Sequence, residues 1–259
     1  MPFLDLPQHR LHYRIDGDGK RPWLLLCNSI GTDLHMWDEQ IEAFSRDFRV
    51  LRYDRRGHAR SSAPPPPWTV SDLGRDVLAL LDALDAERVH FCGLSLGGLI
   101  GQWLALHAPR RIGRLVVCST AAKIGSAEAW RSRIALVRER GMDAVAEATP
   151  SRWFTDAFAQ AHPERVRSIL ATMRSLSPEV YAAYCGILID ADFRAELADI
   201  AAPLLAVAGR DDATTTPADL KCIAHGVADG RYLELPGRHL TNVESAAAFT
   251  PAVLDFLHS

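Results

Sequence analysis

The sequence predicts an α/β fold with a mostly parallel, doubly wound sheet, and two observations carry that prediction. Short apolar runs alternate with stretches of helical pattern along most of the 259 residues. The apolar runs are nearly continuous, as expected for strands of a parallel sheet that is covered on both faces. The chain has 259 residues, of which 48% are hydrophobic, so it has both the length and the apolar content to bury a large core.

The predicted strands and helices alternate in order. Strands are expected at residues 22–29, 48–54, 88–94, 114–120, 203–209 and 231–237. Helices are expected between or after them, at residues 33–47, 69–85, 96–109 and 246–258. Thr69 and Asp72 have the spacing of a capping pair at the start of the second helix. The first segment, residues 3–17, has the pattern of an antiparallel hairpin at one edge of the sheet.

The alternation stops between residues 122 and 198, where the pattern is helical and no strand is expected. We interpret this stretch as a helical cap inserted into a core formed by residues 1–121 and 199–259. A cap after the sixth strand would cover the carboxyl ends of the strands, where ligands bind in α/β sheets. The alternative is a second independent domain.

Composition excludes several classes of function. The formal net charge is −3, so no basic face for nucleic acid is expected. No apolar stretch has the 18 or so residues that a membrane span needs, and the first residues lack the pattern of a signal peptide. Five scattered cysteines without paired spacing predict buried thiols in a reducing cytoplasm. We expect no metal and no cofactor, and the oligomeric state stays open, a homo-oligomer included.

Residues 91–98, Phe-Cys-Gly-Leu-Ser-Leu-Gly-Gly, join a predicted strand to a predicted helix. A nucleophilic serine needs its hydroxyl lifted clear of the backbone, and a tight strand-to-helix turn achieves this. Glycines on both sides, Gly93 and Gly97, relieve the crowding that such a turn creates. Ser95 is therefore predicted to be a nucleophile. The alternative is a small residue in a close-packed turn.

The base and the acid should follow other strands. His239 lies in a predicted loop after the last strand, and Asp211 and Asp212 follow the strand at 203–209. We choose Asp212, because the chain must turn before a carboxylate can point inward, and keep Asp211 as the second choice. Helix capping is the alternative role for either aspartate. The order Ser95, Asp212, His239 is that of α/β-hydrolases.

An oxyanion site needs two backbone N–H groups. Leu96, directly after the nucleophile, should supply one. Ile30, in the loop after the strand at 22–29, is well placed for the other. The alternative for this loop is a simple turn at Gly31.

With these residues in place, the whole chain resembles the α/β-hydrolase superfamily. Residues 53–61, Tyr-Asp-Arg-Arg-Gly-His-Ala-Arg-Ser, look like its Asp-x-Arg-Gly-His-Gly-x-Ser loop, with Ala59 in place of the usual glycine. Residues 28–40 resemble the 3-oxoadipate enol-lactonases of aromatic catabolism, whose loop reads Asn-Ser-Leu-Gly-Thr-Asp-x-x-Met-Trp. The further segments that resemble that family are residues 151–158, 177–185, 211–220 and 239–257. Ile30, Leu96 and Arg238 are mild departures.

The resemblance implies hydrolysis of 3-oxoadipate enol-lactone to 3-oxoadipate in the β-ketoadipate pathway. Ser95 would form an acyl-enzyme, His239 would act as base and then activate water, and Asp212 would orient His239. The substrate is an anion, so a cation should recognise its free carboxylate.

The cap offers residues for that recognition. Arg133 and Arg152 are the expected carboxylate-binding residues, while Trp37, Trp130 and Trp153 would wall a small pocket. For each arginine the alternative is a solvated charge on a helix face.

Other functions remain on the same scaffold. The chain could be a different carboxylesterase, a cofactor-free perhydrolase or a carbon–carbon bond hydrolase. From another class, it could be a ligand receptor that kept the hydrolase fold, although a receptor has less need of all three triad residues.

Overall fold

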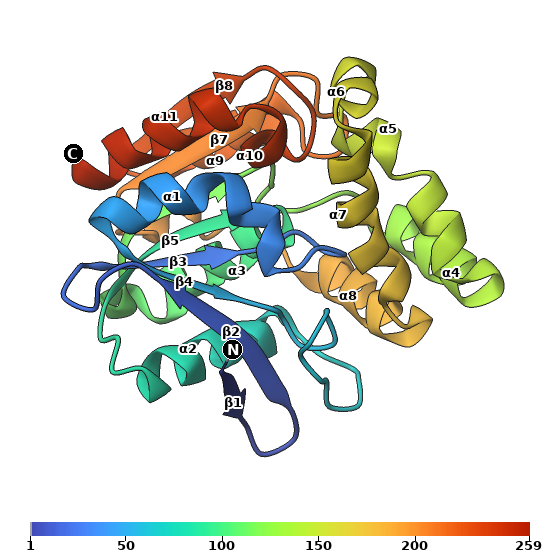
Figure 1. Ribbon diagram of the computed structural model, residues 1–259, viewed down its shortest axis with the longest axis horizontal. Coiled ribbons are helices and arrows are strands. Elements are labelled where there is room, and N and C mark those ends of the chain that lie inside the picture. Colours follow the sequence, from blue (N-terminus) through green and yellow to red (C-terminus); the bar gives the residue numbers. More distant parts are fainter. Residues whose placement is uncertain (1) are drawn as a thin grey trace.

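The computed structural model describes residues 2–259 and contains one eight-stranded sheet (Figure 1). The strand order is β1-β2-β4-β3-β5-β6-β7-β8. The strand bounds are β1 (Phe3–Asp5), β2 (Arg10–Asp16), β3 (Trp23–Cys27), β4 (Arg49–Tyr53), β5 (Val89–Leu94), β6 (Ile112–Cys118), β7 (Leu204–Gly209) and β8 (Gly230–Leu235). All pairs from β4 to β8 are parallel, and the β1–β2 hairpin is antiparallel at the edge. The predicted α/β class and edge hairpin are confirmed.

Helices cover both faces of the sheet (Figure 1). One layer contains α1 (Asp38–Asp47) and α11 (Ala246–His258), and the other contains α2 (Val70–Ala83), α3 (Leu96–His107) and α9 (Pro217–Gly226). The predicted capping box is present, because the Asp72 carboxylate accepts from the Thr69 N–H at 2.8 Å and Thr69 Oγ1 accepts from the Asp72 N–H at 3.3 Å.

Two local elements differ from the sequence prediction. The predicted helix at residues 33–47 begins as a 3-10 turn, η1 (Leu34–Trp37), and only then becomes α1. A short helix that was not predicted, α10 (Thr241–Glu244), follows β8. Each of these two elements has four residues, which is too short for a helical period to show in the sequence.

Between β6 and β7 the described chain forms helices and no strand. These are α4 (Ala127–Glu147), α5 (Pro150–Trp153), α6 (Asp156–Ala161), α7 (Pro163–Ser175), α8 (Pro178–Asp190) and the 3-10 turn η3 (Leu197–Asp199). Another 3-10 turn, η2 (Pro109–Arg111), lies before β6. Figure 1 shows helices α4 to α8 together at one side of the sheet. We call α4 to α8 the cap helices. The division at residues 122 and 198 itself stays a prediction.

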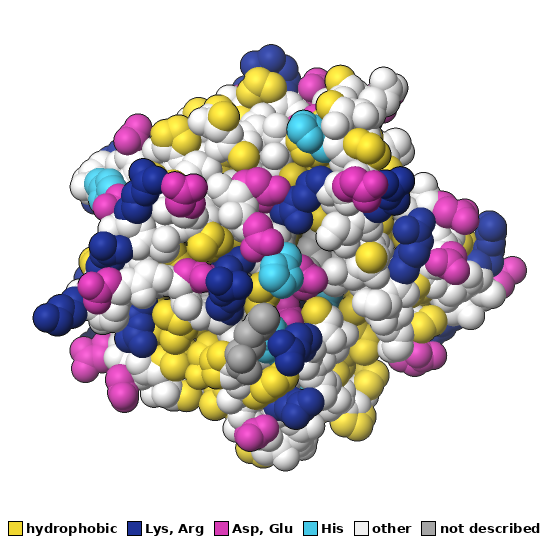
Figure 2. Space-filling model, in the orientation of Figure 1, with side chains coloured by type: hydrophobic (Ala, Val, Ile, Leu, Met, Phe, Trp, Pro, Cys, Tyr) yellow, Lys and Arg dark blue, Asp and Glu magenta, His cyan; other side chains and the backbone are white. Residues whose placement is uncertain are grey.

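Surface and thiol placement agree only in part with the sequence prediction. Figure 2 shows acidic and basic side chains interspersed over the visible face. Four cysteines are buried, but the thiol of Cys222 is exposed on α9, so the prediction of buried thiols is wrong for this residue. Its position faces away from the sheet, on the solvent side of the helix. None of the helices in residues 2–259 is long and apolar enough to cross a membrane.

Candidate active site

Ser95 occupies a strained turn between β5 and α3. Its backbone lies at φ 58° and ψ −117°, a conformation that L-residues rarely adopt, and its N–H donates to the carbonyl of Cys118 at 2.8 Å. A Cβ on Gly97 would stand 2.2 Å from the Cys27 carbonyl oxygen, and one on Gly93 would stand 2.3 Å from the Gly97 oxygen. The two glycines therefore allow backbone approaches that any side chain would block, as the sequence predicted.

His239 and Asp212 meet at the carboxyl edge of the sheet. Asp212 follows β7, His239 follows β8, and His239 Nδ1 lies 2.7 Å from Asp212 Oδ2. The same carboxylate accepts from Thr215 Oγ1 at 2.8 Å and from the Thr214 N–H at 2.8 Å. Burial opposes ionisation of Asp212, but the charge and hydrogen bond of His239 and the two threonine donors outweigh it and hold its pKa below the usual range. The Asp212 carboxylate therefore holds the His239 imidazole through its Nδ1 atom.

The second choice for the acid, Asp211, is placed elsewhere. Its side chain is exposed, and its backbone N–H donates to the Gly237 carbonyl at 2.9 Å. The turn between the two residues sends Asp212 inward and Asp211 into solvent. The geometry therefore favours Asp212.

Two backbone amides are available for an oxyanion. Leu96 is the first residue of α3, and Ile30 belongs to the loop after β3. Neither N–H donates a hydrogen bond to any group in the described chain. The N-terminus of α3 also carries a partial positive charge toward this point. The arrangement suits a developing negative charge on a bound carbonyl.

A small cavity of about 50 Å³ connects these groups with the cap. It is lined by Ile30, Ser95, Ile124, Trp130, Arg133, Thr149, Arg152, Trp153, Met173, Tyr181, Leu188, Thr214 and His239. An outer hollow of about 340 Å³ shares five lining residues with it: Ile124, Trp130, Arg133, Arg152 and Thr214. The outer hollow therefore leads from solvent to Ser95 past both arginines.

Arg133 and Arg152 carry positive charge into this entrance without a carboxylate partner. Within residues 2–259 neither side chain forms an ion pair or a hydrogen bond, and no Asp or Glu lines either hollow. Burial, and then the charge of Arg133, lowers the pKa of the Arg152 guanidinium. Two mutually repelling cations at one entrance fit an anionic ligand that would offset their repulsion.

The three predicted tryptophans separate into two groups. Trp130 and Trp153 line the cavity, and the Trp130 indole N–H donates to the Ile124 carbonyl at 2.7 Å. Trp37 does not line it: the side chain is fully buried beneath the loop, where its N–H donates to Asn28 Oδ1 at 2.9 Å. The prediction that Trp37 walls the pocket is wrong, because its indole supports the loop from inside the core.

Sequence reasoning missed several lining residues, of which Tyr181 is the most informative. Burial raises the pKa of its phenol, so it lines the cavity as a neutral group. It lies in the segment 177–185 that resembles the enol-lactonases, and this was the only signal that could have drawn attention to it. Thr149, Met173 and Leu188 carried no signal, because small hydroxyl and apolar side chains are common on helices.

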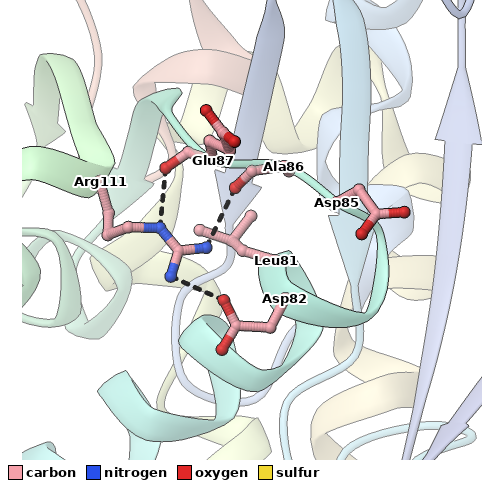
Figure 3. Close-up of a pocket in the computed structure, with 6 residues that line it drawn as sticks. All are labelled: Leu81, Asp82, Asp85, Ala86, Glu87 and Arg111. Carbon is pink, nitrogen blue, oxygen red and sulfur yellow. Dashed lines mark hydrogen bonds and ion pairs between the residues drawn. The ribbon is translucent and has the colours of Figure 1, made fainter.

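A separate hollow lies between the end of α2 and the start of β5 (Figure 3). Arg111 lines it, and its guanidinium donates to the carbonyls of Glu87 at 2.8 Å and Ala86 at 3.0 Å and to the Asp82 carboxylate at 2.7 Å. No Ser, Cys, His or Lys is among its described lining residues, and the Arg111 guanidinium is bound by the Asp82 carboxylate. We therefore interpret these contacts as structural, since they link Arg111 to the end of α2 and the loop after it.

Comparison with known proteins identifies the family of this chain. The model of the alpha/beta hydrolase fold family matches residues 22–246. The chain belongs to this family. It is 43% identical to 3-oxoadipate enol-lactonase 2 of Acinetobacter baylyi, over 94% of this chain and 91% of that protein. It is 34% identical to a putative carbamate hydrolase, RutD, of Variovorax paradoxus, over 95% and 96% of the two chains.

Among solved structures, the enol-lactonase from Burkholderia xenovorans LB400 is similar over the full length of both chains. The two share 44% sequence identity with a TM-score of 0.97. At that similarity the cap helices and the sheet keep one arrangement in both proteins. The predicted fold and the predicted resemblance to enol-lactonases are confirmed.

Proposed function

We propose that this chain hydrolyses 3-oxoadipate enol-lactone to 3-oxoadipate, as a step of the β-ketoadipate pathway. The observation that carries the proposal is that Arg133 and Arg152, which have no carboxylate partner within residues 2–259, line a small cavity. Ser95 and His239 line the same cavity, and Asp212 binds His239 from outside it. A neutral ester would leave both cations uncompensated, whereas a lactone with a carboxylate arm would pair with them. The similarity to proteins named enol-lactonases supports the same substrate.

The first half of the proposed reaction opens the ring. His239 takes the proton of Ser95 as Oγ attacks the lactone carbonyl carbon. The amides of Ile30 and Leu96 hold the oxyanion of the tetrahedral intermediate. When the intermediate collapses, the ring C–O bond breaks and the electron pair leaves on an enolate oxygen. His239 returns its proton, and the enol then tautomerises to the ketone.

The second half releases the product. His239 removes a proton from water, the resulting nucleophile attacks the acyl-Ser95 carbonyl, and the Ser95 oxygen leaves and regains the proton. One water is consumed, and a keto acid is formed. Asp212 keeps Nδ1 of His239 as its hydrogen-bond partner in both halves and stabilises the imidazolium, so Nε2 is left for the proton transfers.

The cap selects the substrate in this proposal. Arg133 and Arg152 bind the free carboxylate, and Trp130, Trp153 and Tyr181 bound a space that suits a five-membered ring. The substrate is the only partner that the proposal requires, and no cofactor takes part. We place the reaction in the cytoplasm, because the buried free thiols suit a reducing compartment.

The test follows the loss of enol-lactone absorbance after addition of purified protein. We expect turnover by the wild-type chain and none above background by Ser95→Ala, with an unchanged fold by circular dichroism. Parallel arms contain a neutral p-nitrophenyl ester and a small carbamate. Turnover of the ester or carbamate without turnover of the lactone would contradict the substrate, and activity in Ser95→Ala would contradict the nucleophile.

A further inference from the structure

Arg55 is a buried cation without a carboxylate partner in the described chain. Its side chain is 1% exposed, and its guanidinium donates to the backbone carbonyls of Asn28 and Ser29 at 2.6 Å each. The other two buried arginines nearby, Arg52 and Arg56, each pair with carboxylates. Burying an uncompensated charge costs stability. The position of Arg55 therefore requires a reason other than packing.

The reason lies in the peptide group that Arg55 contacts. The Ser29 carbonyl and the Ile30 N–H belong to one planar peptide and point in opposite directions. That carbonyl accepts from Arg55 Nη2 at 2.6 Å, from Thr32 Oγ1 at 2.8 Å and from the Thr32 N–H at 3.3 Å. Three donors fix the plane of the peptide, so the Ile30 N–H is held away from Arg55. Ile30 itself lines the cavity.

The second oxyanion amide is supported in the same way. The Ser95 carbonyl, which shares a peptide with the Leu96 N–H, accepts from Thr120 Oγ1 at 2.8 Å and from the N–H groups of Gly98 and Leu99 at 2.8 and 3.2 Å. Here the helix terminus supplies positive potential. At the Ile30 peptide no helix begins, and the charge comes from Arg55.

The groups around Arg55 leave its charge uncancelled. His58 lies 3.4 Å from Nη2 and accepts the Gly31 N–H at Nε2, 3.0 Å away. Burial, and then the charge of Arg55, hold the pKa of His58 well below its usual range, so the imidazole is neutral. The ring of Tyr184, from α8 of the cap, lies 5.3 Å from the guanidinium carbon and is neutral as well.

We propose that Arg55 is a positioning residue of the oxyanion site, which orients the Ser29–Ile30 peptide and polarises its N–H toward the oxyanion. A charged donor on a carbonyl withdraws electron density from that peptide and strengthens its N–H as a donor. The effect appears only when negative charge develops at the cavity, so it acts on the transition state rather than on substrate binding. This inference rests on the proposed function for the position of the oxyanion.

The test compares Arg55→Gln, which removes the charge, with Arg55→Lys, which keeps it. Both are assayed with the enol-lactone and with a neutral p-nitrophenyl ester, so failure of the lactone alone would affect the proposed substrate and not this inference. Removal of a whole oxyanion donor costs about 10²–10³ in kcat, so we expect about 10- to 100-fold from Arg55→Gln, with KM changed by less than about threefold. Arg55→Lys should retain more of kcat.

A second readout separates this role from a merely structural one. A trifluoromethyl ketone adds Ser95 Oγ to its carbonyl carbon, passes the serine proton to His239 and leaves an oxyanion at the site. Its affinity should fall in Arg55→Gln by the same factor as kcat/KM. Arg56→Gln is the matched control, because Arg56 is the next residue in the chain and its guanidinium pairs with Asp76. Loss of that ion pair should lower the melting temperature without lowering kcat per folded molecule.

If Arg55→Gln does not fold, Thr32→Val takes its place, because it removes a neutral donor from the same Ser29 carbonyl. It should lower kcat in the same direction but less. The inference would be overturned by an unchanged kcat in the folded variant, by a change confined to KM, or by equal losses in Arg55→Lys and Arg55→Gln. It would equally be overturned by unchanged inhibitor affinity.

Discussion

The polar groups at the carboxyl edge of the sheet have many hydrogen-bond partners, whereas the charged groups at the entrance under the cap have none among the described residues. At the edge, the Asp212 carboxylate and the carbonyls of Ser29 and Ser95 each accept at least three hydrogen bonds. At the entrance, Arg133 and Arg152 have no partner within residues 2–259. If the chain has the proposed function, this difference means that hydrogen bonds fix the catalytic groups before substrate binds, whereas the two arginines gain a partner only when the substrate carboxylate binds.

The largest effect on this comparison should come from Asp212→Asn. The amide keeps the shape but no longer stabilises an imidazolium, so we expect kcat to fall by about 10⁴-fold. Asp211→Asn is the matched control, because the neighbouring aspartate is exposed and should leave kcat unchanged. Steady-state kinetics of both variants checks the prediction. Equal losses would mean that the carboxylate acts through net charge rather than through His239.

A smaller effect should come from the close packing at the edge. In Gly97→Ala the new Cβ would meet the Cys27 carbonyl oxygen at 2.2 Å, so the free energy of unfolding should fall by about 1–3 kcal/mol and activity should be lost with it. Gly186→Ala on cap helix α8 is the control, because nothing lies within 4 Å of its Cβ and we expect no destabilisation. Urea unfolding measures both. A tolerated Gly97→Ala would show that the edge can relax.

The smallest effect concerns pH. His58 is buried and neutral, with a folded pKa well below its ordinary value of 6.5. Below pH 6.5 the unfolded chain binds a proton that the folded chain does not, so stability falls as pH falls, by up to about 1.4 kcal/mol per unit. In His58→Asn this part of the slope should vanish. Parallel slopes for the two proteins from pH 6.5 to 5 would contradict the prediction.

The sequence predicted the groups at the sheet edge because their signals are local. Ser95, Asp212 and His239 each follow an apolar run, and the carboxyl ends of parallel strands meet at one edge. The choice of Asp212 over Asp211 needed only the direction of one turn. The glycines around Ser95 carry the same kind of information, since tight turns demand small residues.

The remaining features depend on contacts between distant segments. Arg55 belongs to a loop motif, but its role requires the Ser29 carbonyl 26 residues earlier. Trp37 was expected to face substrate as an aromatic near the site, yet Asn28 binds its indole inside the core. Nothing in the helical pattern of the cap indicated that Arg133 and Arg152 would lack acidic partners. Pairing and burial are properties of the folded chain that periodicity does not encode.

One ratio tests most directly whether the arginines at the entrance select the anionic substrate while the groups at the sheet edge perform the chemistry. It is kcat/KM for the enol-lactone divided by kcat/KM for a neutral ester, measured in wild-type chain and in Arg133→Met/Arg152→Met. Because a charged hydrogen bond contributes about 1.5–3 kcal/mol, the account predicts that the ratio falls at least about 10-fold while the neutral ester is little affected. Arg131 is an exposed arginine on α4, the helix that also carries Arg133, and it lines neither hollow, so Arg131→Met should leave the ratio unchanged. An equal loss on both substrates would contradict the account.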